Sequence, residues 1–217
     1  SLFTQPLHED TVLRVRAIRD TDLPEGQPIL QAILDTALPL AVRANPSVAI
    51  SVEGSAIPDH ASGATTRIQG SQRSVTYTAY ACTLYDADFP RTPSPDVPVL
   101  RVPVPGAPEV YVRAPAVPAT WQEPSHIAHV AQAVGTDGDR LLSFQAMQED
   151  SVVIVKAFKS HSAASNLTST LQLVQSVAIL LRPAAVPGLR AVLSRSADAT
   201  SGQLLVSGGQ PGVFYFF

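Results

Sequence analysis

The side chains able to do chemistry in this chain are few and widely spaced. The histidines are His8, His60, His126, His129 and His161. His126 and His129 are three residues apart, but a metal site needs a third ligand and groups that orient the ligands, and no acidic residue stands at a matching distance. The single cysteine, Cys82, excludes an internal disulfide and a cysteine-based metal site, and its apolar surroundings predict a buried, unreactive thiol. We therefore predict polar loop histidines, no metal and no cofactor.

Pairs of acidic residues raise the alternative of calcium binding. They are Asp20 with Asp22 and Glu25, Asp86 with Asp88, and Asp137 with Asp139. Calcium takes six to eight oxygen ligands, of which a pair of carboxylates supplies only a part. Asp137-Gly138-Asp139 is also typical of a turn between strands. Calcium binding stays open as the lesser alternative.

No arrangement typical of an enzyme is present. A nucleophile elbow, a phosphate-binding glycine loop and a Ser/His/Asp set are all missing. Residues 207–212 are rich in glycine, but they join two predicted strands instead of opening a helix. The net charge is −3 and the arginines are scattered, so nothing indicates a nucleic-acid partner. The most apolar run, 171–181, is too short to span a bilayer. We predict no catalysis, no nucleic-acid binding and no membrane insertion.

A proline-rich segment, 86–125, carries the best candidates for ligand contact. It holds ten of the nineteen prolines, which excludes it from the centre of a sheet, although 99–102 and 110–113 have the pattern of short edge strands. Within it, Trp121 and Tyr111 are aromatic side chains that an exposed binding face would use. The segment is interpreted either as a stiff crossover covering a sheet edge, with Trp121 as its apolar plug, or as a ligand-binding loop. Further aromatic candidates are Tyr77, Tyr80 and Tyr85.

An internal repeat sets the frame in which these residues must be placed. Residues 1–20 align without a gap onto 141–160, with seven identities that include Glu9-Asp10 on Glu149-Asp150. The match continues at 40–43 with 179–182, at 62–63 with 201–202, at 68–70 with 206–208, and at 75–77 with 213–215. Asp just before a strand usually caps its turn, and an ion site at a junction between units is the alternative. About 77 residues at the start thus recur at the end, at an offset of about 140.

The repeated segments have the periodicity of strands. Leu13, Val15 and Ala17 alternate with arginines, and the same period of two recurs in 153–157 and 64–69. Short strands separated by turn residues favour a β-sandwich. The one exception that we predict is a helical turn over 125–134, with Ser125 as its N-cap.

The strand pattern resembles immunoglobulin-like and fibronectin type III-like modules. The residues that carry the resemblance are Leu7, Glu9-Asp10, Thr11, Leu13, Val15 and Ala17, and again Met147, Glu149-Asp150, Ser151, Val153, Val155 and Ala157. The chain departs from these families in having Leu13 or Val153 at the corner-tyrosine position and no cysteine pair. The resemblance implies an all-β fold of tandem immunoglobulin-like β-sandwich modules with antiparallel sheets.

The phase of the repeat then divides the chain into three parts. Residues 1–45 would be the C-terminal strands of a first module, 46–186 a complete module with 86–125 as an insertion, and 187–217 the N-terminal strands of a third. In the complete module we expect strands near 47–52, 63–70, 74–83, 139–147, 150–159 and 167–182.

The expected function follows from the modules and from the missing chemistry. We predict a structural or adhesive repeat of a larger protein, extracellular or at the cell surface, whose partners are neighbouring modules or identical chains. One alternative is a glycan- or protein-binding module with its specificity in 86–125. Another is a self-assembling subunit completed by strand exchange between chains.

Overall fold

The structure is a computed structural model that describes most of the chain. The described residues are 7, 9–18, 31–90, 92, 94–104, 106, 108–161, 167–183, 189–195 and 202–208. They form fourteen strands and one short 3-10 turn, η1 (Asp86–Asp88), with no α-helix among them. The chain is therefore nearly all β, as predicted. His8, the acidic group of Asp20, Asp22 and Glu25, and the repeat match at 213–215 lie outside the described residues.

Two antiparallel sheets form the centre of the molecule, which we call the central unit (44–181). One sheet has the order β3-β4-β9, with β3 (Ala49–Glu53), β4 (Ala64–Gln69) and β9 (Arg140–Phe144). The other has the order β11-β10-β5-β8, with β11 (Leu167–Gln172), β10 (Ser151–His161), β5 (Val75–Thr83) and β8 (Ile127–Val134). A short strand, β12 (Val177–Ile179), also pairs with β10. Apart from β8, these strands lie at or close to the ranges expected from the sequence, but the single strand expected at 167–182 is divided into β11 and β12.

One apolar core lies between the two sheets of the central unit. It combines inward side chains of β5 and β10 with those of β3, β4 and β9: Tyr77, Ala79, Ala81, Val153, Val155, Ala157, Ile50, Ile68, Leu142 and Phe144. Alternate residues of a strand point to opposite faces, so the period of two in the sequence places one row of each strand in this core. Fully burying a side chain the size of Ile68 or Leu142 stabilises the fold by roughly 1.5–3 kcal/mol.

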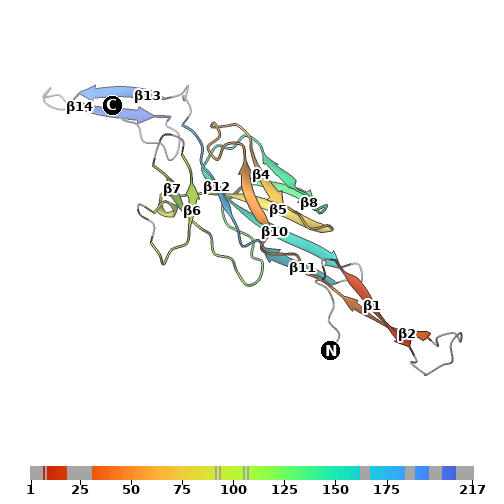
Figure 1. The fold of residues 1–217 in the computed structure, drawn as a ribbon. Coiled ribbons are helices and arrows are strands. Elements are labelled where there is room, and N and C mark those ends of the chain that lie inside the picture. The colour runs from red at the N-terminus through yellow and green to blue at the C-terminus, as the bar shows by residue number, and fades with distance from the viewer. Residues whose placement is uncertain are drawn as a thin grey trace.

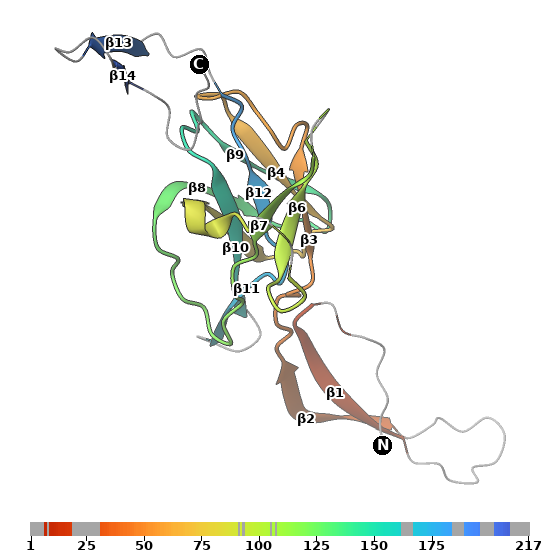
Figure 2. The same cartoon turned by 90° about the vertical axis from the view of Figure 1, so that its left-hand side faces the viewer.

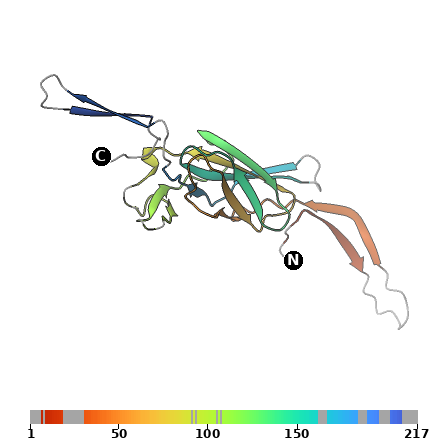
Figure 3. The same cartoon turned by 90° about the horizontal axis from the view of Figure 1, so that it is seen from above.

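Two hairpins lie outside the central unit, at its opposite ends (Figures 1 and 3). The first joins β1 (Thr11–Ile18) to β2 (Gln31–Leu40), and the second joins β13 (Arg190–Arg195) to β14 (Gly202–Ser207). Both hairpins expose large apolar side chains, among them Ile33 and Leu205, which are 64 % and 65 % exposed.

The β1–β2 hairpin repeats the pairing of β10 in the central unit. Thr11 pairs with Leu40 and Arg16 with Ile33, while the aligned residues of β10 pair in the same way, Ser151 with Ile179 and Lys156 with Gln172. In both ladders the second strand carries two more residues than the first between these pairs. The sequence repeat is therefore also a repeat of strand register and of its irregularity.

The β13–β14 hairpin repeats β3–β4 in the same manner. Arg190 pairs with Ser207 as Ala49 pairs with Gln69, and each ladder continues residue by residue from there. A glycine in the left-handed region follows each second strand: Gly70 has φ 61° and Gly208 has φ 74°. Only glycine adopts this conformation without strain, which accounts for the repeated Gly.

The insertion forms a third layer on the central unit (Figure 2). Its strands β6 (Val99–Val102) and β7 (Val110–Arg113) lie at the expected ranges, but they pair with each other and not with the edge of a larger sheet. Val102 and Val112 pack against residues in and beside β12, and Leu100 contacts the outward face of β5 and β10. The segment thus covers an outer sheet face as well as an edge.

The predicted helical turn over 125–134 is wrong. Residues 127–134 form β8, which pairs antiparallel with β5. Ile127, His129 and two alanines are half-buried, and the residues between them are exposed. The inward alanines are hardly more apolar than the outward residues, so the alternation is weak in the sequence. Ser125 before it has the residue type of a helix N-cap, which led to the helical prediction.

Candidate functional site

A cluster of ionisable side chains joins the first hairpin to the central unit. We call it the junction cluster: Asp10, Lys159 and His161. Asp10 directly precedes β1, and the other two lie at the end of β10. Lys159 Nζ lies 3.1 Å and His161 Nδ1 lies 3.0 Å from Asp10 Oδ1. A residue near the start of the chain therefore meets one 151 positions later.

The junction cluster is almost completely buried. The side chains of Asp10, Lys159 and His161 are 9 %, 4 % and 1 % exposed. Burial raises the pKa of Asp10, but hydrogen bonds from Val42 N–H, His161 and Lys159 outweigh it and lower that pKa to about 2. A carboxylate can only accept, so His161 carries a proton on Nδ1. Its Nε2 lies 3.1 Å from Ser169 Oγ, which orients the ring from β11.

The cluster holds both strands of the hairpin. Val42 N–H, just beyond β2, donates to Asp10 Oδ1 at 2.9 Å, and Lys159 Nζ donates to Val42 O at 2.9 Å. The chain then enters the central unit, where Asn45 N–H donates to Gln72 Oε1 at 3.1 Å. The bridge is thus a closed set of hydrogen bonds among side-chain and backbone groups that ties the first hairpin to the central unit.

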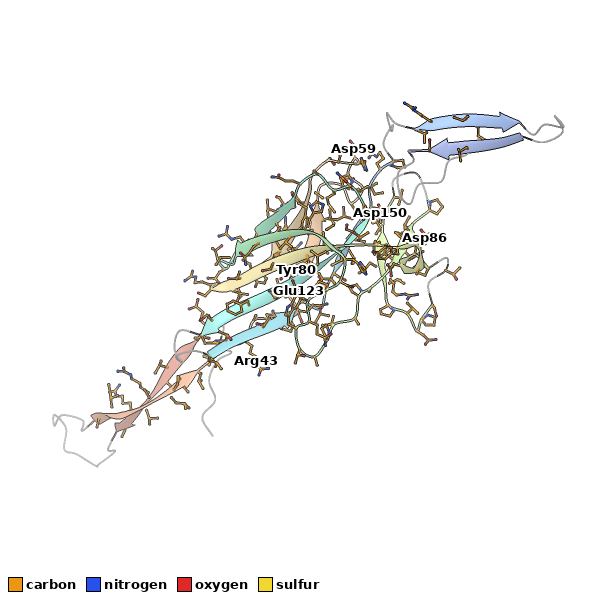
Figure 4. The ribbon with its side chains drawn as sticks, turned by 180° about the vertical axis from the view of Figure 1, so that it is seen from behind. Arg43, Asp59, Tyr80, Asp86, Glu123 and Asp150 are labelled. Carbon is orange, nitrogen blue, oxygen red and sulfur yellow. The ribbon has the colours of Figure 1, made fainter. Side chains whose placement is uncertain are left out.

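Asp150 repeats part of this arrangement at the other end of the central unit. Leu181 N–H donates to Asp150 Oδ1 at 2.7 Å, and Leu181 aligns with Val42 in the sequence repeat. The hydroxyl that follows each Asp also bonds alike: Thr11 to Glu9 O at 3.1 Å and Ser151 to Glu149 O at 3.0 Å. The hydroxyl of Thr11 or Ser151 thus closes each turn, whereas each aspartate accepts a distant N–H and not, as expected, one of its own turn. In Figure 4, Asp150 lies toward β13–β14 and Arg43 toward β1–β2.

Trp121 packs into the protein surface. Its ring lies 5.4 Å from that of Tyr80, and Lys156 Nζ lies 5.3 Å and 5.5 Å from the Trp121 and Tyr80 centroids. A cation over two aromatic faces adds to the stacking. Tyr111 is half-buried, and its hydroxyl donates to Glu109 Oε2 at 3.4 Å. These two candidates are not brought together in one described contact, and Trp121 acts as the apolar plug of the insertion.

A groove of about 810 Å³ lies between the insertion and the end of β5. Tyr85, Asp88, Arg113 and His126 line it together with prolines and apolar side chains. Tyr85 is 51 % exposed, and its hydroxyl lies 3.0 Å from His126 Nδ1, with the rings edge to face. A groove that combines a few polar side chains with apolar ones is the kind of surface that binds small ligands or short peptides.

The remaining sequence candidates lie apart from one another and have structural roles. Cys82 is buried, and burial raises the pKa of its thiol to about 11. Asp139 accepts Gly70 N–H and pairs with Arg67, while Asp88 accepts Tyr85 N–H. Within the described ranges no group of three or more His, Cys, Asp or Glu side chains could hold a metal ion.

Sequence reasoning missed the junction cluster. His161 was expected in a loop, but it lies in a strand and is buried. The chain has only two lysines, Lys156 and Lys159, and each makes a specific contact from β10. The scarcity of lysine was the one sequence feature that could have drawn attention to Lys159. No local sequence pattern indicates a contact between residues so far apart along the chain.

Comparisons with known proteins identified no family for this chain. No protein-family model matches it, and searches of curated proteins and of solved structures found no match. Within the part of the chain that is described, no helix is long and apolar enough to cross a bilayer.

Proposed function

We propose that this chain is a stretch of tandem immunoglobulin-like β-sandwich modules that serves as a structural or adhesive element of a larger protein. The observation that carries the proposal is the repeat of strand register. β1–β2 has the ladder of β10 with β11 and β12, and β13–β14 has the ladder of β3–β4. Consecutive modules of one kind account for both hairpins.

The strand order of the central unit supports the fibronectin type III-like variant of this fold. Read in chain order as A, B, C, C′, E, F and G, its strands form one sheet A-B-E and a second sheet G-F-C-C′. The first hairpin would then correspond to F–G of a preceding module and the last to A–B of a following one. An extracellular or surface location is part of the same proposal and rests on the resemblance alone.

The junction cluster supports a mechanical role. A flexible linker between modules needs no buried ion pair, and desolvating two charges costs several kcal/mol unless they are well paired. Here Asp10, Lys159 and His161 are buried together and satisfied by one another and by backbone groups. Such a cluster fixes one orientation between neighbouring modules, as a stiff array requires.

The groove beside the insertion favours a second candidate, a glycan- or protein-binding module. Tyr85 and His126 supply an exposed aromatic ring and a polar partner at its mouth. Recognition would then use this groove, since Trp121 is packed against Tyr80. Tyr85→Ala, with Tyr111→Ala outside the groove lining as a matched control, tests this candidate on glycan and peptide arrays. Binding that only Tyr85→Ala removes would establish it.

The intact mass of the denatured polypeptide from its native source tests the main proposal. A mass several times the 22.9 kDa of this chain is expected for an array of modules. A mass near 22.9 kDa contradicts it and makes self-assembly between identical chains the leading function.

A further inference from the structure

The second copy of the junction Asp, Asp150, has one of its expected partners and lacks the others. Asp10 is bonded by Val42 N–H from its own hairpin and by Lys159 and His161 from the strand that follows. Asp150 receives Leu181 N–H, the counterpart of Val42 N–H. Among the described residues no cationic side chain reaches its carboxylate. Burial raises the pKa of Asp150, and the hydrogen bond from Leu181 offsets only part of this rise. At Asp10 the net shift of the pKa is downward.

The hairpin beyond Asp150 is built to be covered by the same kind of strand. In β3–β4 the pair Ile50 and Ile68 is buried in the core that β10 completes. The corresponding pair in β13–β14, Ala191 and Val206, is exposed and half-exposed. The element that would bury it is a strand equivalent to β10. In the central unit that strand also brings the lysine to the preceding module's aspartate.

Resting on the proposed array, we infer that Asp150 is the acceptor of a second junction, and that it binds the ammonium of a lysine presented by the β10-type strand of a following module. The partner is thus a module of the same kind, docked on Asp150 as the central unit docks on Asp10. Residues 189–195 and 202–208 are the first hairpin of that module.

The first experiment uses the chain as it stands. Carboxyl-carbon NMR follows the titration of Asp10 and Asp150 in one sample, each assigned by its Asp→Asn variant. Asp10 is expected to titrate at about 2, and Asp150 above the ordinary value of 3.8. An Asp150 that titrates as low as Asp10 already has its partner within this chain, and the inference is overturned.

The second experiment supplies the partner. Phe217 aligns with Ala79 when the match of 75–77 with 213–215 is extended, so the full chain is lengthened after Phe217 by a second copy of residues 80–186. The pKa of Asp150 should then fall to that of Asp10. The control is Lys159→Met in the added copy alone, which should restore the raised value.

Two other outcomes are informative in different ways. If the added residues protect their amides from hydrogen exchange while the pKa of Asp150 stays raised, the Asp150 junction is refuted and the array proposal stands. If the added residues show no protected amides, the equivalence of the modules fails, and the proposed function falls together with this inference.

Discussion

Replacing Asp10 by asparagine should detach the first hairpin while leaving the central unit folded. Asparagine can still accept Val42 N–H, but it removes the charge that faces Lys159 and His161. Removing one member of a buried ion pair typically costs ~3–5 kcal/mol, because the other charge stays buried and unpaired. The pKa of Asp10, lowered from 3.8 to about 2, corresponds to ~2 kcal/mol of that stabilisation at neutral pH. A loss of ~2 kcal/mol raises the population of the detached state by roughly 30-fold.

The reactivities of the two lysines report the detachment of the hairpin within a single sample. Reductive methylation modifies exposed amines, and peptide mass spectrometry reports Lys156 and Lys159 separately. Lys156 is half-buried and serves as the internal reference, whereas Lys159 is 4 % exposed. We expect Lys159 to react slowly in the unchanged protein and roughly 30-fold faster in Asp10→Asn, with Lys156 unaffected. Asp86→Asn, an exposed carboxylate in η1, is the matched control and should change neither rate.

Acidity should have the same effect as the substitution. Because the folded-state pKa of Asp10 is lowered, its stabilisation is complete above the unfolded value near 3.8 and is lost as the pH falls through about 2. Detachment followed by circular dichroism or NMR should therefore rise between about pH 4 and pH 2, and Asp10→Asn should lack that step. Equal methylation rates for Lys159 and Lys156 in the unchanged protein, or an unchanged Lys159 rate in Asp10→Asn, would refute the reasoning.

Three further predictions concern the central unit. Trp121→Ala removes the plug of the insertion and should lower the free energy of unfolding by roughly 2 kcal/mol in urea titrations, and Trp121→Phe should recover most of the loss; equal stability of the two variants would contradict this. Cys82, whose thiol pKa burial raises to about 11, should stay unreactive toward an aromatic disulfide reagent at pH 8 and react fully in denaturant; fast native-state labelling is the contrary result. Gly135→Ala places a Cβ 2.1 Å from the carbonyl oxygen of Gln72 and should lower the melting temperature by several degrees, whereas Gly138→Ala, with open space around it, should not; similar melting temperatures would show that the close approach is unimportant.

Strand positions in the central unit could be predicted from the sequence because each strand turns alternate residues toward the core between the two sheets, although β5 and β10 also bury part of their outer face under the insertion. Val153, Val155 and Ala157 alternate with less apolar or outward residues, and the repeat supplies a second reading of the same pattern at Leu13, Val15 and Ala17. Alternation of this kind is a local property, so one sequence is enough to detect it. The strand β8 was not predicted because its inward alanines differ little in hydrophobicity from its outward residues.

The junction cluster could not be predicted, because its members are close in space and not in sequence. Asp10 was expected to cap its own turn, but the N–H that it accepts comes from Val42, at the far end of the hairpin. Its second role depends on β10 being long enough to carry Lys159 and His161 past the edge of the central unit. The role of Trp121 likewise depends on which face of β5 the insertion covers, and strand periodicity leaves that undetermined.

The central proposal is that the junction cluster holds the first hairpin in one fixed orientation on the central unit. Residual dipolar couplings of backbone amides in β1, β2 and the central unit test it most directly on the full chain. The account predicts that one alignment tensor fits both sets of couplings in the unchanged protein and that Asp10→Asn requires two. Two tensors in the unchanged protein, or one tensor that persists in Asp10→Asn, would contradict it.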